Sequence, residues 1–199
     1  PTVRKLAEEL NLSIAKKKDS TGICFIGERN FRQFLSNYLP MKPGNIIDIN
    51  TKKVVGQHGG VMYYTVGQRK GLDIGGIGPF YVIGKDVTKN ELYVTDEEHQ
   101  EWLYSTSCSI IDVNWLADRK LPLTCNAKFR YRQQDNPVTV SLREDGTLIA
   151  SFPEKIRSVT PGQEAVIYDG DTLVCGGKID VVYQNDKDLM KEILDTVNA

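Results

Sequence analysis

The feature that most constrains the fold is a long series of short β-prone runs between residues 46 and 183. Segments such as NIIDI, VMYYTVG and FYVIGKDV are rich in Val, Ile and Tyr, and turns containing Gly, Asn or Pro separate them. This pattern predicts strands rather than helices over most of the chain.

The strand pattern divides into two parts. Residues 46–95 predict a small β-rich unit. Residues 102–183 predict six further strands at nearly regular spacing, which favours a closed barrel. The six segments are SCSIIDVNW, LTCNAKFRYR, VTVSLRED, TLIASF, EAVIYDG and KIDVVYQ.

Helical spacing is found at the two ends of the chain. Apolar residues of segment 3–10 recur at the spacing of three and four that predicts a short amphipathic helix, and residues 31–38 predict a second one that ends before Pro40. The tail, NDKDLMKEILDTVNA, is compatible with either a frayed or a docked helix. A helix at the very start, with no strand before it, suggests that the sequence is part of something larger.

We therefore expect a mainly β protein with a few helices, of the α+β class. The expected parts are the end of a catalytic domain with a linker at 1–35, a central β-rich domain at 36–103, a C-terminal six-stranded β-barrel at 104–183 and a tail at 184–199.

Composition narrows the function classes. The 25 basic and 26 acidic residues give a net charge of −1, so the whole molecule is no general binder of polyanions and local patches must supply any such contact. No apolar run approaches the ~20 residues of a membrane helix, and the first residues lack a secretion signal. A cytosolic monomer with no membrane contact is expected.

Cysteine and histidine usage argues against a zinc site and against disulfide staples. The four cysteines form no CxxC motif, and neither histidine lies near them in sequence. Packing within strands explains Cys108, Cys125 and Cys175. His58 in GQHGG and His99 in TDEEHQEW are expected to be surface or loop histidines, because neither has a triad partner in sequence.

Cys24 is the thiol with a chemical setting. It lies beside the Ser-Thr-Gly turn of DSTGICFIGER, with Lys16, Lys17 and Lys18 before it and Arg29 after it. Positive charge and turn amides lower a thiol pKa and raise the thiolate fraction. The alternative is an ordinary buried thiol among apolar neighbours, and the residues alone favour that reading.

Two segments have the composition of a nucleic-acid contact, KFRYRQQ at 128–134 and GQRKG at 67–71. If the first is a strand, Lys128, Arg130 and Arg132 share one face while Phe129 and Tyr131 share the other. Three cations in a row can bind phosphates, but a solvated strand face explains them equally well. The Gly-rich GLDIGGIGP lacks the order of a phosphate-binding loop, and its glycines permit either a tight path of the chain or a close approach to a bulky partner.

Together, DSTGICFIGERNFRQFL, GQHGGVMYYTVGQRKGLDIGG, AKFRYRQ and TPGQEAVIYDG resemble the signature segments of the tRNA-specific 2-thiouridylase family, in the same order and over residues 1–180. The resemblance implies an enzyme whose N-terminal domain, with an SGGxDS loop absent here, adenylates the wobble uridine of tRNA with ATP and Mg²⁺. The helix at the start would then be a remnant of that α/β domain.

The resemblance also implies site residues. Cys24 corresponds to the cysteine that receives sulfur as a persulfide from a sulfur-donor protein or cysteine desulfurase, and this reverses the reading from the local residues. The tRNA contacts of the family map onto Arg130, Tyr131 and Gln163, with further candidates at Lys16, Lys17, Lys18, Gln68, Arg69 and Lys70.

The leading hypothesis is thus a fragment of a tRNA sulfurtransferase, acting on tRNAs of the Lys, Glu and Gln type, that binds no cofactor or metal itself and is inactive without the ATP-binding domain. The alternative is a stand-alone RNA-binding module in which Cys24 only packs.

Overall fold

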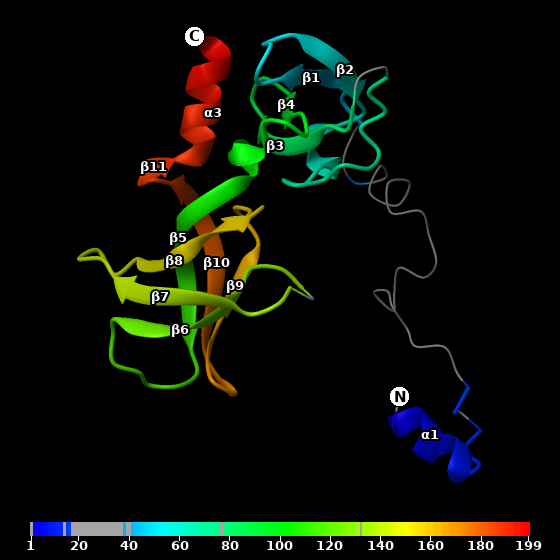
Figure 1. The fold of residues 1–199 in the computed structure, drawn as a ribbon, viewed down its shortest axis with the longest axis vertical. Helices are drawn as coiled ribbons and strands as arrows, with labels where there is room; N and C mark the ends of the chain where they lie inside the picture. The colour runs from blue at the N-terminus through cyan, green and yellow to red at the C-terminus, as the bar shows by residue number, and fades with distance from the viewer. Residues whose placement is uncertain (1, 14, 17–37, 39–40, 76–77, 132) are drawn as a thin grey trace. The chain divides into compact units, whose positions relative to one another are not determined.

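The structure is a computed structural model that describes residues 2–13, 15–16, 38, 41–75, 78–131 and 133–199 (Figure 1). The chain forms two compact units, residues 1–40 and 41–199. In the first unit, helix α1 spans Thr2–Glu9, which confirms the helix expected at this end. Its apolar side chains Val3 and Leu6, and Leu10 just after it, are exposed. The helix predicted at 31–38 lies outside the described residues except for Tyr38.

The second unit begins with a four-stranded sheet. Its strands are β1 (Gly44–Asp48), β2 (Val54–His58), β3 (Tyr81–Asp86) and β4 (Glu91–Thr95), in the order β2-β1-β4-β3. Strands β1 and β4 are parallel, and the other pairs are antiparallel. A 3-10 helix, η1 (Val61–Tyr63), lies between β2 and β3. The small β-rich unit expected from the sequence is confirmed.

Six longer strands then close into a barrel. They are β5 (Tyr104–Trp115), β6 (Leu123–Lys128), β7 (Asn136–Leu142), β8 (Leu148–Arg157), β9 (Glu164–Asp169) and β10 (Thr172–Gln184). The order β10-β5-β8-β7-β6-β9 is closed by the pairing of β10 with β9. Alternate side chains of β8, namely Leu148, Ala150 and Phe152, are buried, as the interior of a small barrel requires. The expected barrel is confirmed.

The chain ends in a docked helix, which resolves the alternative left open for the tail. After the short β11 (Lys187–Asp188), helix α3 spans Leu189–Asn198. The Asp188 side chain caps its first turn by accepting a hydrogen bond from the Lys191 backbone N–H at 3.1 Å. Leu189 and Ile193 are buried.

One apolar cluster connects these elements. It contains Ile47, Ile83 and Tyr93 of the four-stranded sheet, the inward side chains of the barrel, and Leu189 and Ile193 of α3. A smaller cluster fills the other side of the four-stranded sheet around Ile46 and Leu92. The four-stranded sheet, the barrel and α3 therefore share a core.

Helix α3 should stabilise this shared core measurably. Ile193 is 1% exposed, so Ile193→Ala removes buried methyl groups and leaves a cavity, with an expected loss of about 3 kcal/mol in the free energy of unfolding. The exposed neighbour Lys191→Ala is the control and should change it by less than about 0.5 kcal/mol. Urea unfolding followed by circular dichroism measures the free energy of unfolding of both variants. Equal changes in the two variants would show that α3 is not part of the core.

Candidate functional site

The candidate residues near the N-terminus are not all described. Cys24, Lys17 and Lys18 lie outside the described residues. Lys16 is an exposed turn residue of the first unit. The site can therefore be built only from the candidates of the second unit.

The first part of the site is the segment 65–70, which follows η1. Its Gly67 backbone N–H donates to the Val82 carbonyl at 2.7 Å, and the Val82 N–H donates to the Gln68 carbonyl at 3.0 Å, so the segment is fixed against β3. The Gln68 side chain accepts from the Thr65 N–H at 3.2 Å and donates to the Lys70 carbonyl at 2.9 Å. Gln68 thus shapes the loop, whereas Arg69 and Lys70 are exposed.

The second part is the turn after β6, where the expected strand alternation is wrong. Strand β6 ends at Lys128, and the next residues form a turn in which Phe129 is fully buried while Tyr131 is 90% exposed. The Gln133 side chain accepts from the Phe129 N–H at 2.9 Å, and the Gln133 N–H donates to the Arg130 carbonyl at 3.2 Å. These bonds replace the strand ladder, so Phe129 and Tyr131 do not share a face.

Arg130 points back into the protein. Its Nη2 donates to the Val66 carbonyl and, at 2.8 Å, to the Thr160 hydroxyl. The guanidinium is half-buried, and this desolvation lowers its pKa, although an arginine stays protonated at neutral pH. Arg130 therefore connects the loop before β3 to a barrel turn.

The third part is the TPGQ turn between β8 and β9. The Gly162 N–H donates to the Ile179 carbonyl, and the Ile179 N–H donates to the Gln163 carbonyl, both at 2.8 Å, which fixes the turn against β10. Gln163 itself is exposed. The turn therefore presents an exposed side chain on a backbone that hydrogen bonds hold in place.

The segment 65–70 closely approaches Ser158, which lies two residues before Thr160, the first residue of this turn. A Cβ atom on Gly67 would overlap the Ser158 hydroxyl oxygen, and the Gly67 φ of +84° also favours glycine. The Ser158 hydroxyl is buried and has no hydrogen-bond partner in the described structure. We refer to Val66, Gly67, Arg130, Ser158 and Thr160 as the loop junction. Of these five residues, only Arg130 and Gly67, the first residue of GQRKG, had been singled out from the sequence.

The loop junction connects the segments that carry the candidates of the second unit. Arg130, the neighbour of the exposed Tyr131, is bonded to Val66 of the segment with Gln68, Arg69 and Lys70, and to Thr160 of the turn with Gln163. A hollow of about 340 Å³ lies along the Gly-rich loop that follows Lys70. Its described lining is Arg69, Gly71, Leu72, Asp73, Ile74, Gly78, Pro79 and Phe80.

The three described cysteines confirm the packing interpretation. Cys108 and Cys175 are fully buried, and Cys125 is partly buried. Burial raises the pKa of Cys108 to about 12 and contributes most to raising those of Cys125 and Cys175 to about 11. These thiols stay protonated at neutral pH and are poor nucleophiles.

His58 is not the loop histidine expected from the sequence. It is the last residue of β2, is 2% exposed, and stands between two backbone groups. Its Nδ1 accepts from the Gly60 N–H at 3.1 Å, so Nε2 carries the proton and donates to the Asn90 carbonyl at 3.2 Å. Desolvation lowers its pKa, because the charged form is disfavoured in this site.

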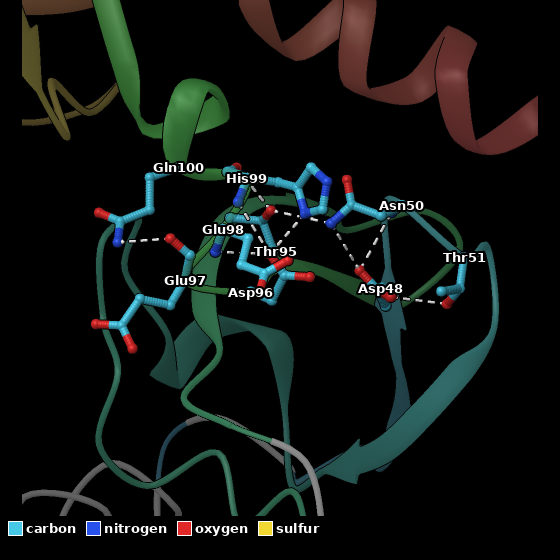
Figure 2. A network of polar contacts seen from close by, with 9 residues as sticks. All are labelled: Asp48, Asn50, Thr51, Thr95, Asp96, Glu97, Glu98, His99 and Gln100. Atoms are coloured by element: carbon cyan, nitrogen blue, oxygen red, sulfur yellow. Dashed lines mark hydrogen bonds and ion pairs between the residues drawn. The ribbon is translucent and has the colours of Figure 1, made fainter.

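The partly exposed His99 belongs to a structural network (Figure 2). Its Nδ1 and its backbone N–H both bind Asp96 Oδ1, at 2.7 and 2.9 Å. The Thr95 hydroxyl donates to the His99 carbonyl at 2.8 Å and accepts from the Asn50 side chain, which also binds Asp48. These bonds fix the connection from β4 to the barrel. The ring of His99 is bonded to the Asp96 carboxylate in this network and not to a hydroxyl or thiol that it could activate.

The described part of the chain supports neither a metal site nor a membrane-spanning helix. No group of three or more His, Cys, Asp or Glu residues there could hold a metal ion. None of the described helices has the length and apolar character to cross a membrane.

Three domain families match the chain, in order. They are the tRNA methyl transferase HUP domain at residues 1–28, the tRNA methyl transferase PRC-barrel domain at 32–96 and the Aminomethyltransferase beta-barrel domain at 105–179. The last two cover the four-stranded sheet and most of the barrel, whereas α3 lies beyond them.

Curated relatives match nearly the whole chain. The tRNA-specific 2-thiouridylase MnmA of Listeria monocytogenes serotype 4b (strain F2365) is 53% identical over 186 residues, which is 92% of this chain and 50% of that protein. The tRNA-specific 2-thiouridylase MnmA of Enterococcus faecalis (strain ATCC 700802 / V583) is 54% identical over 194 residues, 94% of this chain and 52% of that protein. The chain spans about half the length of the curated relatives it matches.

The close approach at Gly67 can be tested with a matched glycine. Gly146 has nearly the same φ, +83°, but nothing lies within 4 Å of its Cβ position. Gly146→Ala should cost about 1 kcal/mol from backbone strain alone. Gly67→Ala should cost about 2 kcal/mol more, because its methyl group overlaps Ser158.

Urea unfolding measures this difference. Ser158→Gly should recover most of the extra loss in the Gly67→Ala background, because it removes the overlapping side chain. Equal losses for the two alanine variants would contradict the contact.

The two histidines should titrate in opposite directions. His58 should have a pKa below 6.5, and His99, paired with Asp96, a pKa above it. Because the unfolded chain binds a proton at position 58 more readily, the His58 contribution to stability is lost as the pH falls below about 6.5. His99 acts oppositely: its pair stabilises the fold below about 6.5, and this is lost as the pH rises through its folded pKa.

Proton NMR of the ring resonances measures both pKa values, with His99→Asn for the assignment. Removing His99 should steepen the loss of stability on acidification from pH 7 to about 5.5. A His58 pKa above 6.5 would contradict the buried neutral ring.

Proposed function

Because the chain belongs to the tRNA-specific 2-thiouridylase family, we propose that it is the part of a tRNA uridine sulfurtransferase that binds tRNA and carries the sulfur-accepting cysteine, Cys24. The relatives are named for 2-thiouridylation, and they match more than nine tenths of this chain. Two of the matched domains have names that refer to tRNA methyl transferase, but each covers only one segment of the chain. For assigning the function they are weaker evidence than relatives that match more than nine tenths of it.

The observation that carries the proposal is that the hydrogen bonds of Arg130 connect the segments that carry the exposed, RNA-compatible side chains. Arg69 and Lys70 are exposed cations suited to phosphates, and the exposed Tyr131 can stack on a base. Gln163, on its rigid turn, can read a base edge or a ribose hydroxyl. Because the net charge of the chain is only −1, its overall charge does not favour RNA binding. These local side chains are therefore the stronger argument for an RNA contact.

The proposed chemistry at Cys24 is a sulfur transfer that needs no external oxidant. The Cys24 thiolate attacks the terminal sulfur of a persulfide on a sulfur-donor protein or cysteine desulfurase. A new bond forms between that sulfur and Cys24 Sγ, the donor S–S bond breaks, and the donor leaves as a thiolate. The sulfur held on Cys24 is the one destined for the wobble uridine of tRNAs of the Lys, Glu and Gln type.

This chain's own residues do not fit ATP and magnesium, which the family resemblance implies for activation of the uridine. The sequence has no SGGxDS loop, and the described residues hold no cluster of metal ligands. We therefore assign no step through ATP to these residues.

A stand-alone RNA-binding module is the second candidate. It would use the same surface around the loop junction, and Cys24 would be an inert packing residue. Sulfur on Cys24 separates the two candidates, since only the sulfurtransferase needs it.

The test is intact-mass spectrometry after incubation of the chain with a cysteine desulfurase and cysteine. The wild type should gain one reducible sulfur, about 32 Da, and Cys24→Ser should gain none. Cys125→Ser is the control and should gain sulfur like the wild type, because its partly buried thiol stays protonated. Equal labelling of all thiols, or no labelling, would favour the RNA-binding module.

A further inference from the structure

We propose that Arg130 is a positioning residue that holds the segment 65–70 against the barrel, so that one tRNA meets Arg69, Lys70, Tyr131 and Gln163 together, and that it does not itself bind a phosphate. The inference rests on the proposed tRNA binding and assigns Arg130 a different role from its neighbours.

The hydrogen bonds of Arg130 carry the first step. Its Nη2 has two hydrogens, and the structure gives that nitrogen two protein acceptors, the Val66 carbonyl and the Thr160 hydroxyl. The Thr160 hydroxyl uses its own hydrogen on the Ser158 carbonyl at 2.9 Å, so it can only accept from Arg130. The chain of bonds therefore has a single direction, from Arg130 through Thr160 to Ser158.

The second step is that these bonds connect two separately fixed loops. The segment 65–70 is bonded to β3 of the four-stranded sheet through Val82, and the turn at 160–163 is bonded to β10 of the barrel through Ile179. Arg130 lies on a third element, the turn after β6, and is bonded to both. Without it, the described hydrogen bonds leave each loop fixed to its own sheet.

The third step is the fit between the loops. Gly67 leaves no room for a side chain beside Ser158, and the Arg130 Nη1 lies 3.7 Å from the position of a Gly67 Cβ atom. Ser158 and Thr160 are 5% and 8% exposed. An RNA strand cannot reach these two side chains, so their bonds serve the protein and not the ligand.

Burial supports the same assignment. The half-buried guanidinium contrasts with Tyr131, which is 90% exposed, and with the exposed Arg69 and Lys70. Both bonds come from Nη2, whose two hydrogens the planar guanidinium holds in fixed directions. The positive charge of Arg130 still adds to the local potential that attracts phosphates.

Thr160→Val separates positioning from phosphate binding. This variant keeps the shape of the side chain and removes its hydroxyl, which accepts from Arg130 and donates to the Ser158 carbonyl. If Arg130 positions the loops, tRNA affinity falls although Thr160 cannot touch RNA. If Arg130 binds phosphate, releasing its Nη2 leaves the affinity unchanged or higher.

The experiment measures the Kd for tRNA of Arg130→Ala, Thr160→Val and the double variant, with native folding checked by circular dichroism. We expect Arg130→Ala to weaken binding about tenfold, Thr160→Val to weaken it less, and the double variant to match Arg130→Ala, because both changes break one link. Arg143→Ala is the control: this arginine follows the far end of β7 from the Arg130 turn and should leave the affinity unchanged.

Amide hydrogen exchange supplies a readout independent of RNA. The Gly67 and Val82 amides, which fix the segment 65–70 to β3, should exchange faster in Arg130→Ala. Wild-type affinity in Thr160→Val, together with unchanged exchange in Arg130→Ala, would overturn the proposal. If the wild-type chain binds no tRNA, the proposed function fails, and the exchange result alone then decides whether Arg130 links the loops.

Discussion

The structure of the second unit depends on burial of apolar surface between its two sheets. Ile47, Ile83 and Tyr93 of the four-stranded sheet enter the cluster that also fills the barrel, and α3 adds Leu189 and Ile193. Burial of apolar area is strong but has no direction, so it brings the sheets together without specifying how their loops align. The polar loop junction supplies that direction, because hydrogen bonds are satisfied only in a narrow range of geometries.

This division of roles explains why a charged residue stands between the two loops. A guanidinium pays a desolvation penalty when it is half-buried, and the lowered pKa of Arg130 reflects this penalty. Bonds to the Val66 carbonyl and the Thr160 hydroxyl offset it, and they are lost if the loops separate. A hydrophobic contact at the same place would tolerate sliding, whereas this pair of bonds does not.

The strands and the barrel could be predicted from the sequence because they follow local rules. Runs rich in Val, Ile and Tyr between turn residues are enough to indicate them. The errors came from contacts that these local patterns do not contain. His58 is buried with its ring hydrogen-bonded, because Nε2 donates to the Asn90 carbonyl, 32 residues away in the sequence. The FRYR segment alternates like a strand, but the side chain of Gln133 and the burial of Phe129 end the ladder at Lys128. Val66, Ser158 and Thr160 carry no sequence signal for their role, which arises only when the two sheets meet.

The position of β10 in the chain has a consequence for biosynthesis. Strand β5 pairs with β8 on one edge and with β10 on the other, and β10 also closes the barrel against β9. Because β10 spans Thr172–Gln184, a ribosome releases it after all other barrel strands, and one edge of β5 stays unpaired until then. An open edge is a template for pairing with another chain. The nascent barrel is therefore most exposed to misassembly just before β10 emerges, and its closure depends on this strand.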